Sequence, residues 1–581
     1  MRFVLGVCAF FVIGMVAMPI HGQDSDLQKR YDHISDLRNQ GYELVHSAHG
    51  GHGDLAKAET LLQEAIAQAD QFLSSQAATE DLWAQADSRR SESLIFLAEA
   101  YALKGDKNAA LNALETMQSS GLYLFHEKIL EQSAGLKSLH DEPRFKALMD
   151  RYKHMESRWN ASALNGQTEN LDEAHRIAGL SLFWSEARYN FAHFDNVPDL
   201  DWNQAYLDYL PRVIAAKTTH DYYDVMMQFA SLLHDGHTHV VPPRAIVNEF
   251  WATPAISTSL VEEKVIVTAL RSPATRASGL HVGDEIVSID GQDVRTYALT
   301  KVNPYVDSSS PQDRIATMYG RRLLAGDHRQ PVTLGIVDAA GHSHSVTLSR
   351  EGDPHADALS PVVWRMLDGD IAYLAVNEFG DDAGVKAFEQ HLPEILHAKG
   401  LIIDVRRNGG GSTQNGAAIL SYLDKKPIPL SAAVSMDYVP VFRAWQGPYV
   451  LWKPVGPAQP YSVERKQHYE GPVAVLIGPY TFSAAEDFVV SFDSMKRGTL
   501  LGEATGGSTG QPLTIDLPGG GKGWICSKND TYPDGRVFVG KGISPAMIIK
   551  PTVEDVRNNR DPVIDGATEL LRKRDAMTAS R

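Results

Sequence analysis

Residues 472–492 read PVAVLIGPYTFSAAEDFVVSF and contain a strand, a turn and a helix in that order. The run from Val473 to Ile477 is continuously apolar, which is typical of a strand buried on both faces of a parallel sheet. A Gly-Pro turn follows, and the apolar spacing after it predicts a helix with Phe488 on its buried stripe. The stretch therefore predicts an α/β domain in which helices cover a sheet.

The alternation of strand and helix continues before this stretch. IAYLAV (371–376) precedes one helix pattern, and LIIDV (401–405) precedes the glycine-rich run RRNGGGS and another helix. Because parallel strands need a crossover, usually a helix, we predict one α/β domain over residues 355–575.

The chain has a different pattern in its first half. Residues 250–350 contain short apolar strands separated by turns, and include SPATRASGLHVGDEIVSIDGQDV (272–294). This run resembles a PDZ domain, a β domain that binds a peptide by adding it as a strand to a sheet edge. Residues 156–245 are mostly helical and rich in Trp and Tyr. We therefore predict a PDZ-like β domain at 250–350 behind a helical segment.

Residues 24–155 have helical periodicity. In LAEAYALKGDKNAALNALE (97–115), small and apolar residues form a stripe on each side of a Gly-Asp turn, which resembles a tetratricopeptide unit. AKAETLLQEAIAQA (56–69) resembles the second helix of an earlier unit, but a stable array needs about three repeats or more. Two interpretations stay open: a packing spacer, or a platform that docks a protein partner.

Residues 1–22 have the features of a secretory signal peptide. Arg2 precedes an uncharged apolar run of about 16 residues, below the ~20 that span a bilayer, and a polar stretch follows. We predict cleavage after Gly22 and export, to the periplasm or the exterior of a bacterial envelope. No later run of 18 uncharged apolar residues occurs, so we expect no transmembrane segment in the mature chain.

The composition is that of an ordinary globular protein. Of 581 residues, 43% are hydrophobic and 22% are charged, which excludes a fibrous or largely disordered chain. The formal net charge is −17 without a basic block, so we expect no nucleic-acid partner. Cys8 and Cys526 are the two cysteines, which excludes a disulfide-stapled scaffold and a Cys-rich zinc module.

Ser483 stands where the predicted strand of residues 473–477 passes into a helix. A helix N-terminus leaves backbone N–H groups unpaired and carries roughly half a positive charge. A serine there can be an N-cap, which is a common role for this residue type. It can also be a nucleophile whose developing oxyanion is met by the N–H group of Ala484.

Two further motifs contain residues suited to catalysis. IIDVRRNGGGST (402–413) places three glycines after a buried strand, and its N–H groups could hold an anion. The run lacks GxxxxGK[ST], so a phosphate loop is disfavoured. HDGHTHVVPP (234–243) offers His237 as a general base, an H-x-H pair as a metal site, or plain surface histidines. No other His/Cys cluster has the spacing of metal ligands, so we predict neither a metal nor another cofactor.

Four segments together resemble the tail-specific, or carboxyl-terminal-processing, serine proteases. In order behind the PDZ-like segment, they are IIDVRRNGGG (402–411), TFSAAEDFVVSF (481–492), LLGEATGG (500–507) and GKGISP (540–545). The resemblance covers roughly residues 170–570. It implies that 156–245 is the helical N-terminal part of a protease module whose catalytic domain is 355–575.

The resemblance assigns roles to individual residues. It implies that Ser483, in the S-A-x-E motif, is the nucleophile. It also implies that the backbone N–H groups of Gly410 and Ala484 form the oxyanion hole. Gly411 is the neighbour of Gly410 in this loop. One branch of the family uses a Ser-Lys pair, but TGGSTGQ (505–511) has a serine where that lysine would stand.

The other branch resembles tricorn protease and interphotoreceptor retinoid-binding protein, and there a histidine ahead of the PDZ segment is the base. His237 matches that position, and imidazole is the better base near neutral pH. This branch has a glutamate shortly before G-I-x-P, where RVFVGKGISP (536–545) has valines. The carboxylate that would orient His237 stays open among Asp235, Glu486, Asp530 and Asp534.

These observations predict an exported serine endopeptidase that cleaves unfolded or C-terminal peptide segments through Ser483 and His237. The alternative is a weakly active or inactive binding protein of the same fold that holds peptides or apolar ligands. A third possibility is a peptide-docking adaptor that uses the helical repeats and the PDZ-like domain, which would tolerate Ser483→Ala.

Overall fold

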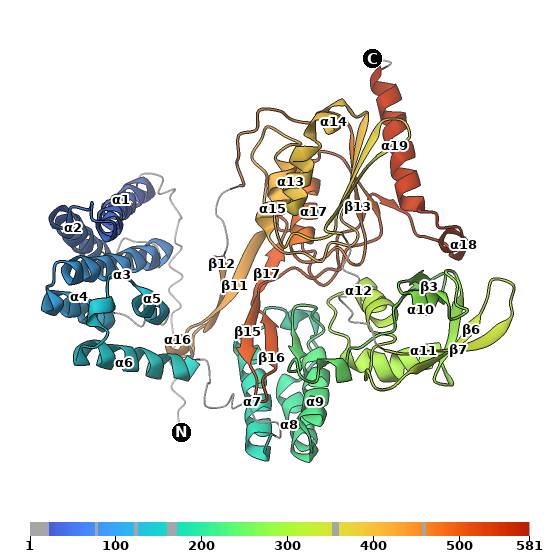
Figure 1. Cartoon of the computed structure of the whole chain (residues 1–581), viewed down its shortest axis with the longest axis horizontal. Helices are drawn as coiled ribbons and strands as arrows, with labels where there is room; N and C mark the ends of the chain where they lie inside the picture. Colours follow the sequence, from blue (N-terminus) through green and yellow to red (C-terminus); the bar gives the residue numbers. More distant parts are fainter. Residues whose placement is uncertain are drawn as a thin grey trace, which may run out of the picture. The chain divides into compact units, whose positions relative to one another are not determined.

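The computed structural model divides into two compact units, Met1–Ala161 and Ser162–Arg581 (Figure 1). The structure describes residues 23–75, 80–120, 126–159, 171–350, 360–455 and 460–579. The predicted signal peptide, residues 1–22, lies outside the described residues. Across the described part of the chain, no helix has both the length and the apolar character needed to cross a membrane.

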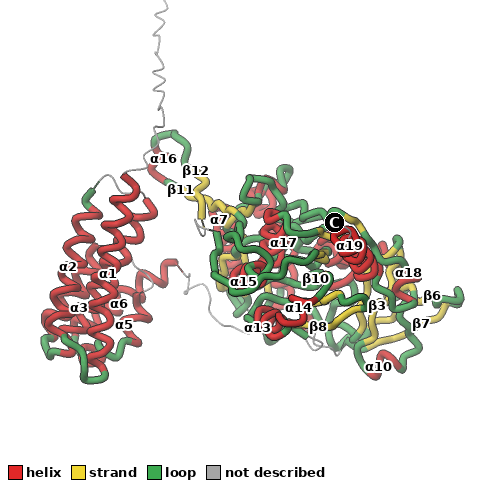
Figure 2. Tube along the Cα trace, turned by 90° about the horizontal axis from the view of Figure 1, so that it is seen from above, coloured by secondary structure: helices red, strands yellow, loops and turns green. Residues whose placement is uncertain are grey.

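The first unit is built from helices (Figure 2). They are α1 (Gln23–His49), α2 (Leu55–Leu73), α3 (Glu80–Leu103), α4 (Lys107–Ser120), α5 (His126–Gln132), the short 3-10 helix η1 (Lys137–Leu139) and α6 (Pro143–Trp159). Gly105 makes the turn between α3 and α4 with φ of +83°, and Ala100 and Ala110 on either side are fully buried. The predicted helical region is confirmed, whereas its tetratricopeptide character and its partner stay predictions.

The second unit begins with three helices and a small sheet. The helices are α7 (Glu173–Asn190), α8 (Trp202–Ala215) and α9 (Thr219–Ser231), and the sheet has the order β1 (His239–Val241), β16 (Lys522–Cys526), β15 (Pro512–Asp516). β1 pairs antiparallel with β16, so that His239 faces Trp524. This pairing ties the segment before the PDZ-like region to a strand almost 300 residues later.

Residues 256–348 form an antiparallel sheet, as the strand pattern predicts. Its order is β2 (Ile256–Val261), β3 (Lys264–Leu270), β4 (Glu285–Ile289), β6 (Val332–Val337), β7 (Ser343–Leu348), and β5 (Gln292–Asp293) also pairs with β4. Short helices lie between the strands, among them α10 (Pro273–Arg276) and α12 (Pro311–Ala316). The β architecture is confirmed, and its assignment as a PDZ domain stays a prediction.

A six-stranded sheet forms the centre of the C-terminal domain. Its order is β18 (Met547–Ile548), β14 (Thr499–Gly502), β13 (Val473–Ile477), β10 (Gly400–Asp404), β9 (Ile371–Val376), β8 (Val362–Leu367). All neighbours are parallel except β8 and β9. The predicted α/β domain and its three quoted strands are therefore confirmed.

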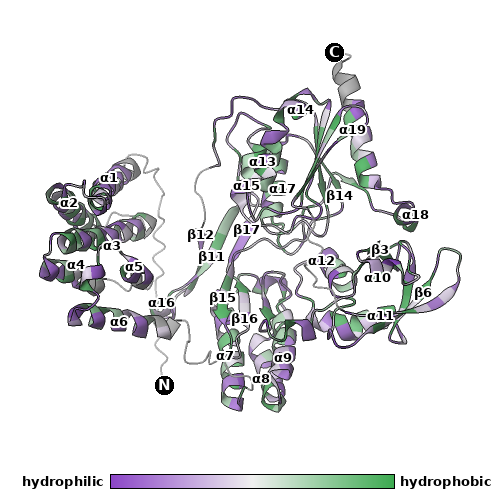
Figure 3. Ribbon diagram, viewed as in Figure 1, coloured by the Kyte–Doolittle hydropathy of each residue, from purple (hydrophilic) through white to green (hydrophobic). Residues whose placement is uncertain are grey.

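Both faces of this sheet are covered, which explains the continuous apolar strands. Along β13, Val473, Val475 and Ile477 join one core with α13 (Ala383–Gln390), α15 (Thr413–Leu420) and α17 (Ala484–Met495). The intervening Ala474 and Leu476 join a second core with α19 (Pro562–Ala579). In Figure 3 the hydrophobic colour follows β14 and other strands at the centre of this domain.

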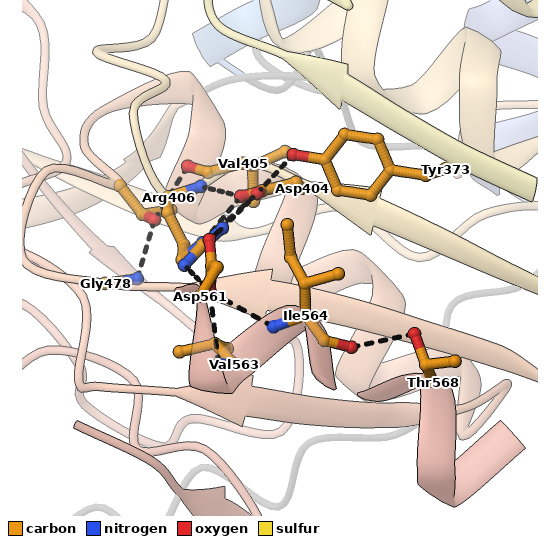
Figure 4. Close-up of polar contacts among 10 residues, drawn as sticks. Tyr373, Asp404, Val405, Arg406, Gly478, Asp561, Val563, Ile564 and Thr568 are labelled. Atoms are coloured by element: carbon orange, nitrogen blue, oxygen red, sulfur yellow. Dashed lines mark hydrogen bonds and ion pairs between the residues drawn. The ribbon is translucent and has the colours of Figure 1, made fainter. Parts of the chain in front are cut away.

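An ion-pair network fastens α19 to the end of β10 (Figure 4). The Arg406 guanidinium donates hydrogen bonds to both carboxylate oxygens of Asp404 and to both of Asp561, which precedes α19. Tyr373 Oη donates to Asp404 from the neighbouring strand at 2.8 Å. The C-terminal helix is thereby held by charge as well as by its apolar face.

A second small sheet borders the central domain. It has the order β12 (Val450–Val455), β11 (Ala432–Tyr438), β17 (Lys528–Thr531), and α16 (Pro440–Ala444) lies at the tip of the β11–β12 hairpin (Figure 2). β17 follows β16 in the chain, so one continuous segment contributes to both small sheets.

Candidate active site

Ser483 lies between β13 and α17, at the carboxyl end of a parallel strand. Its backbone has φ of +57° and ψ of −129°, a conformation that costs a non-glycine residue about 1–3 kcal/mol. The side chain makes no capping hydrogen bond to α17, so the N-cap interpretation is wrong. The strained turn instead presents the hydroxyl to residues from other segments.

The glycine loop after β10 lies beside Ser483, because β10 and β13 are parallel neighbours in the sheet. Gly410 has φ of +104°, and a Cβ built on it would lie 2.6 Å from the Cβ of Ser483. Its N–H donates to Asn408 Oδ1 at 2.9 Å, within the loop. The N–H groups of Gly411 and Ala484 have no hydrogen-bond acceptor among the described residues.

His237 contacts Ser483 directly. Its Nε2 lies 3.1 Å from Ser483 Oγ, and its ring stacks on Phe482 with centroids 4.9 Å apart. The histidine is 9% exposed, and burial lowers its pKa, an effect that the negative charge of Asp235 opposes. A buried imidazole of low pKa is neutral at neutral pH and can accept a proton from the serine hydroxyl.

Ser508 holds the other nitrogen of the same ring. Ser508 Oγ lies 3.0 Å from His237 Nδ1, and the backbone carbonyl of Ser508 accepts a hydrogen bond from the Ser483 N–H. The 505–509 segment thus contacts both partners of the Ser-His pair. Ser508 is the serine of TGGSTGQ (505–511) that stands where the Ser-Lys branch would have its lysine, and its contact with His237 was not predicted from the sequence.

Glu486 binds the 505–509 segment through hydrogen bonds. Its carboxylate accepts hydrogen bonds from the N–H groups of Gly507 and Ser508 at 2.8 and 2.7 Å, and from the hydroxyls of Thr505 and Thr509. Burial raises the pKa of Glu486 to about 7, although these four hydrogen bonds lower it. The carboxylate acts on the loop that holds the imidazole and makes no hydrogen bond to His237.

The other three candidate carboxylates are engaged elsewhere. Asp235 accepts hydrogen bonds from the hydroxyls of Thr238 and Ser309 at 2.6 and 3.0 Å. Asp530 pairs with Lys528, and Asp534 lies at the surface beside Arg536. None of these carboxylates is hydrogen-bonded to His237.

The histidine motif divides between two environments. His237 contacts Ser483, whereas His239 begins β1 and packs edge-on against Trp524, so the H-x-H pair does not form a common ligand set. One cluster of metal-ligand types that sequence spacing missed is His193, Asp235 and Cys526, buried with ligand atoms within 4.8 Å of one another. Cys526 Sγ lies 3.4 Å from His193 Nε2, so the thiol and the imidazole are within hydrogen-bond distance of each other. Burial raises the pKa of the Cys526 thiol, which favours its protonated form.

Part of the chain is similar in sequence to known peptidases. Residues 370–549 match the model of Peptidase family S41. The chloroplastic C-terminal processing peptidase of Tetradesmus obliquus is 23% identical over 289 residues, which are 50% of this chain and 57% of that protein. The tail-specific protease of Haemophilus influenzae is 26% identical over 291 residues, 47% of this chain and 36% of that protein.

The fold has a counterpart among solved structures. Mature CPAF complexed with lactacystin superposes with a TM-score of 0.55 at 17% identity, over 70% of this chain and 98% of that one. The chain spans less than two thirds of the length of the two proteases above. The predicted resemblance to tail-specific proteases is confirmed, and residues 370–549 relate the chain to serine-type peptidases.

Proposed function

We propose that the chain is a serine endopeptidase in which Ser483 is the nucleophile and His237 is the general base. The observation that carries the proposal is the 3.1 Å approach of His237 Nε2 to Ser483 Oγ beside a helix N-terminus. A nucleophile and a base within hydrogen-bond reach, the base being held by a third group, are the signature of covalent catalysis. The related proteases support a polypeptide as the substrate.

The proton and the acyl group move in two stages. Ser483 Oγ attacks the scissile carbonyl while its proton passes to His237 Nε2, and His237 then gives that proton to the departing amine. Water attacks the resulting ester with His237 as base, which releases the new carboxyl terminus and restores the serine. We propose that Ser508 Oγ accepts a hydrogen bond from Nδ1–H of the neutral ring, which leaves the Nε2 lone pair free to take the proton from Ser483.

The oxyanion would form beside the N-terminus of α17. The Ala484 N–H has no acceptor among the described residues and lies one residue after the nucleophile. The Gly410 N–H is engaged by Asn408, so we propose that it joins the oxyanion hole only when substrate displaces that contact. The unpaired Gly411 N–H is the neighbouring candidate.

The test is covalent labelling of the full chain with a fluorophosphonate probe, followed by mass spectrometry of the adduct. Labelling at Ser483 that disappears in Ser483→Ala and falls sharply in His237→Ala supports the proposal. Absence of labelling in a folded chain would instead support the binding-protein alternative, which is favoured by the lack of a carboxylate hydrogen-bonded to His237. The stacking of His237 on Phe482 makes circular dichroism of both variants a necessary folding control.

The more specific parts of the function are also proposals. We propose that unfolded or C-terminal segments are cleaved, by analogy with the proteases named above, and that the antiparallel sheet of residues 256–348 captures the peptide at an edge. We propose export on the sequence of residues 1–22. A docking role for the N-terminal helices is proposed on their repeat-like sequence alone.

A further inference from the structure

A cavity of about 420 Å³ lies along segments that carry the candidate active site. Its volume falls within the range of roughly 300–1,000 Å³ usual for sites that hold small ligands. Three segments that surround Ser483 also line it. Thr413 follows the glycine loop, Asp487 lies one turn into α17, and Gln511 follows the segment that holds His237.

This placement suggests which part of a peptide would enter. The carbonyl attacked by Ser483 would have its oxygen near the Ala484 N–H and the glycine loop. The side chain of the same residue, on the acyl side of the scissile bond, would then point toward the neighbouring wall. That wall is the cavity bounded by Thr413 and Asp487.

The charged groups around the cavity are unequal in number. Asp487 and Asp530 line it with one ammonium group, Lys528, whose Nζ lies 2.8 Å from Asp530 Oδ1. The hydroxyls of Thr413 and Ser431 each donate to Asp487 at 2.7 Å, which holds that carboxylate in place. The two carboxylates therefore outnumber the single ammonium.

Asp530 has one carboxylate oxygen that makes no hydrogen bond to the described residues. It is 1% exposed, and its Oδ2 has no hydrogen-bond partner among the described residues. Burial raises its pKa to about 6, against the lowering effect of Lys528, so the carboxyl is mainly ionised at neutral pH. A buried carboxylate oxygen without a partner is costly, and a cation that enters beside it would offset that cost.

Part of the remaining wall is apolar and suits a long aliphatic stem, beside the polar Gln414, Ser435, Gln511 and Ser527. The apolar lining comes from Leu430, which precedes β11, from Ala433 in β11 and from Val455 at the end of β12. Lysine and arginine combine such a stem with a cationic head, so both parts of either side chain find a complementary surface.

We propose that this cavity is the subsite for the residue on the acyl side of the scissile bond, and that it favours lysine or arginine over glutamate or aspartate. Asp530 and Lys528 set this preference in opposite directions, since one attracts a cation and the other repels it. The proposal rests on the proposed function for the identity of the ligand as a peptide.

Binding can be measured without catalysis in the full-length Ser483→Ala chain. The probes are fluorescent peptides acetyl-Ala-Ala-X-Ala-Ala-amide with arginine, leucine or glutamate at X, followed by fluorescence anisotropy. We expect the arginine peptide to bind about tenfold more tightly than the glutamate peptide, as one charge-assisted hydrogen bond permits. Asp530→Asn should lower this ratio and Lys528→Gln should raise it. Asp534→Asn, at an exposed aspartate outside the cavity lining, is the matched control.

Opposite shifts in the two variants cannot come from a general loss of structure, which would weaken both peptides in both proteins. Equal binding of the three peptides, or a ratio that moves the same way in both variants, would overturn the subsite. Fluorophosphonate labelling of the unmutated chain separates the two proposals. Failure to label with the arginine preference intact would reject the peptidase and leave the cavity as a binding site for a basic side chain.

Discussion

The hydroxyl of Ser508 lies 3.0 Å from Nδ1 of His237, at the sequence position where the Ser-Lys branch of the tail-specific proteases is expected to have its lysine. That position therefore contacts the proposed base here instead of supplying it. Glu486 fixes the position by accepting the backbone N–H of Ser508 at 2.7 Å. A chain of contacts thus runs from the buried carboxylate of Glu486, through the Ser508 loop, to the His237 imidazole and the Ser483 hydroxyl.

Replacing Ser508 by alanine should lower kcat on a peptide substrate about ten- to a hundredfold while the fold is retained, because an imidazolium loses one hydrogen-bond acceptor. The loss makes the protonated ring less stable, so the pKa of His237 should fall and the acid limb of kcat/KM should move to lower pH. The measurement is kcat/KM from pH 5 to pH 9.

A purely structural role for Ser508 would reduce activity without moving the acid limb, and that outcome would contradict the positioning role. Ser491→Ala is the matched control, since Ser491 is also a buried serine but lies farther along α17. We expect this variant to keep both the rate and the profile.

The unmutated chain should lose activity as the pH falls from 8 to 6. The proposed mechanism needs His237 as a neutral base, and burial lowers its pKa, so protonation of this ring contributes mainly below the usual value of about 6.5. Glu486, with a pKa raised to about 7, takes up a proton first and then holds the Ser508 segment less firmly. Glu486→Gln, which mimics the protonated carboxyl, should therefore be impaired at pH 8 and show a smaller further loss at pH 6.

Identical relative losses in the variant and in the unmutated chain between pH 8 and pH 6 would show that Glu486 does not titrate in this range. Glu554→Gln on α18 (Val553–Arg557) provides a control at an exposed glutamate. It should reproduce the unmutated profile.

The glycines of the 409–411 loop should differ sharply in their tolerance of alanine. A Cβ at Gly410 would lie 2.6 Å from the Cβ of Ser483 and 2.9 Å from the Phe482 carbonyl, at a φ of +104°. Gly410→Ala should therefore cost at least about 2 kcal/mol and abolish labelling of Ser483. A Cβ at Gly409 meets no atom within 4 Å, so Gly409→Ala should stay within about 0.5 kcal/mol. Urea unfolding and probe labelling of both variants would measure this, and equal effects would refute the close approach.

The strands of the central sheet could be predicted from sequence, because burial on both faces leaves an apolar run with no polar alternation. Ser483, Gly410 and His237 could also be found, since each belongs to a local motif. The partner of His237 could not. The motifs predicted a carboxylate at this place, whereas the contact is the hydroxyl of Ser508, which a loop distant in sequence brings to the ring.

The cavity was equally hidden from sequence. Thr413, Asp487 and Lys528 belong to three separate segments, and their meeting depends on β17 pairing with β11 beside α17. The pair Lys528 and Asp530 looks in sequence like an ordinary alternating strand face. The burial of Asp530 in the structure distinguishes this pair from a solvated ion pair.

The link between Asp561 and Arg406 gives a prediction for stability (Figure 4). Burial alone would raise the pKa of Asp561, but its hydrogen bonds to Arg406 and the charge of that guanidinium lower it overall. A carboxyl whose folded pKa lies below its unfolded pKa stabilises the fold above the unfolded value, and this contribution is lost as the pH falls through the folded value. Asp561→Asn should therefore reduce the free energy of unfolding by about 1–3 kcal/mol at pH 7. The difference from the unmutated chain should stay constant down to about pH 4 and shrink below it.

Urea unfolding at pH 7, 5 and 3.5 measures this difference, with the exposed Asp565→Asn of α19 as the control. A deficit that persists undiminished at pH 3.5 would contradict a contribution from the charge of Asp561, because asparagine keeps an Oδ1 that can accept the N–H groups of Val563 and Ile564 as Asp561 does.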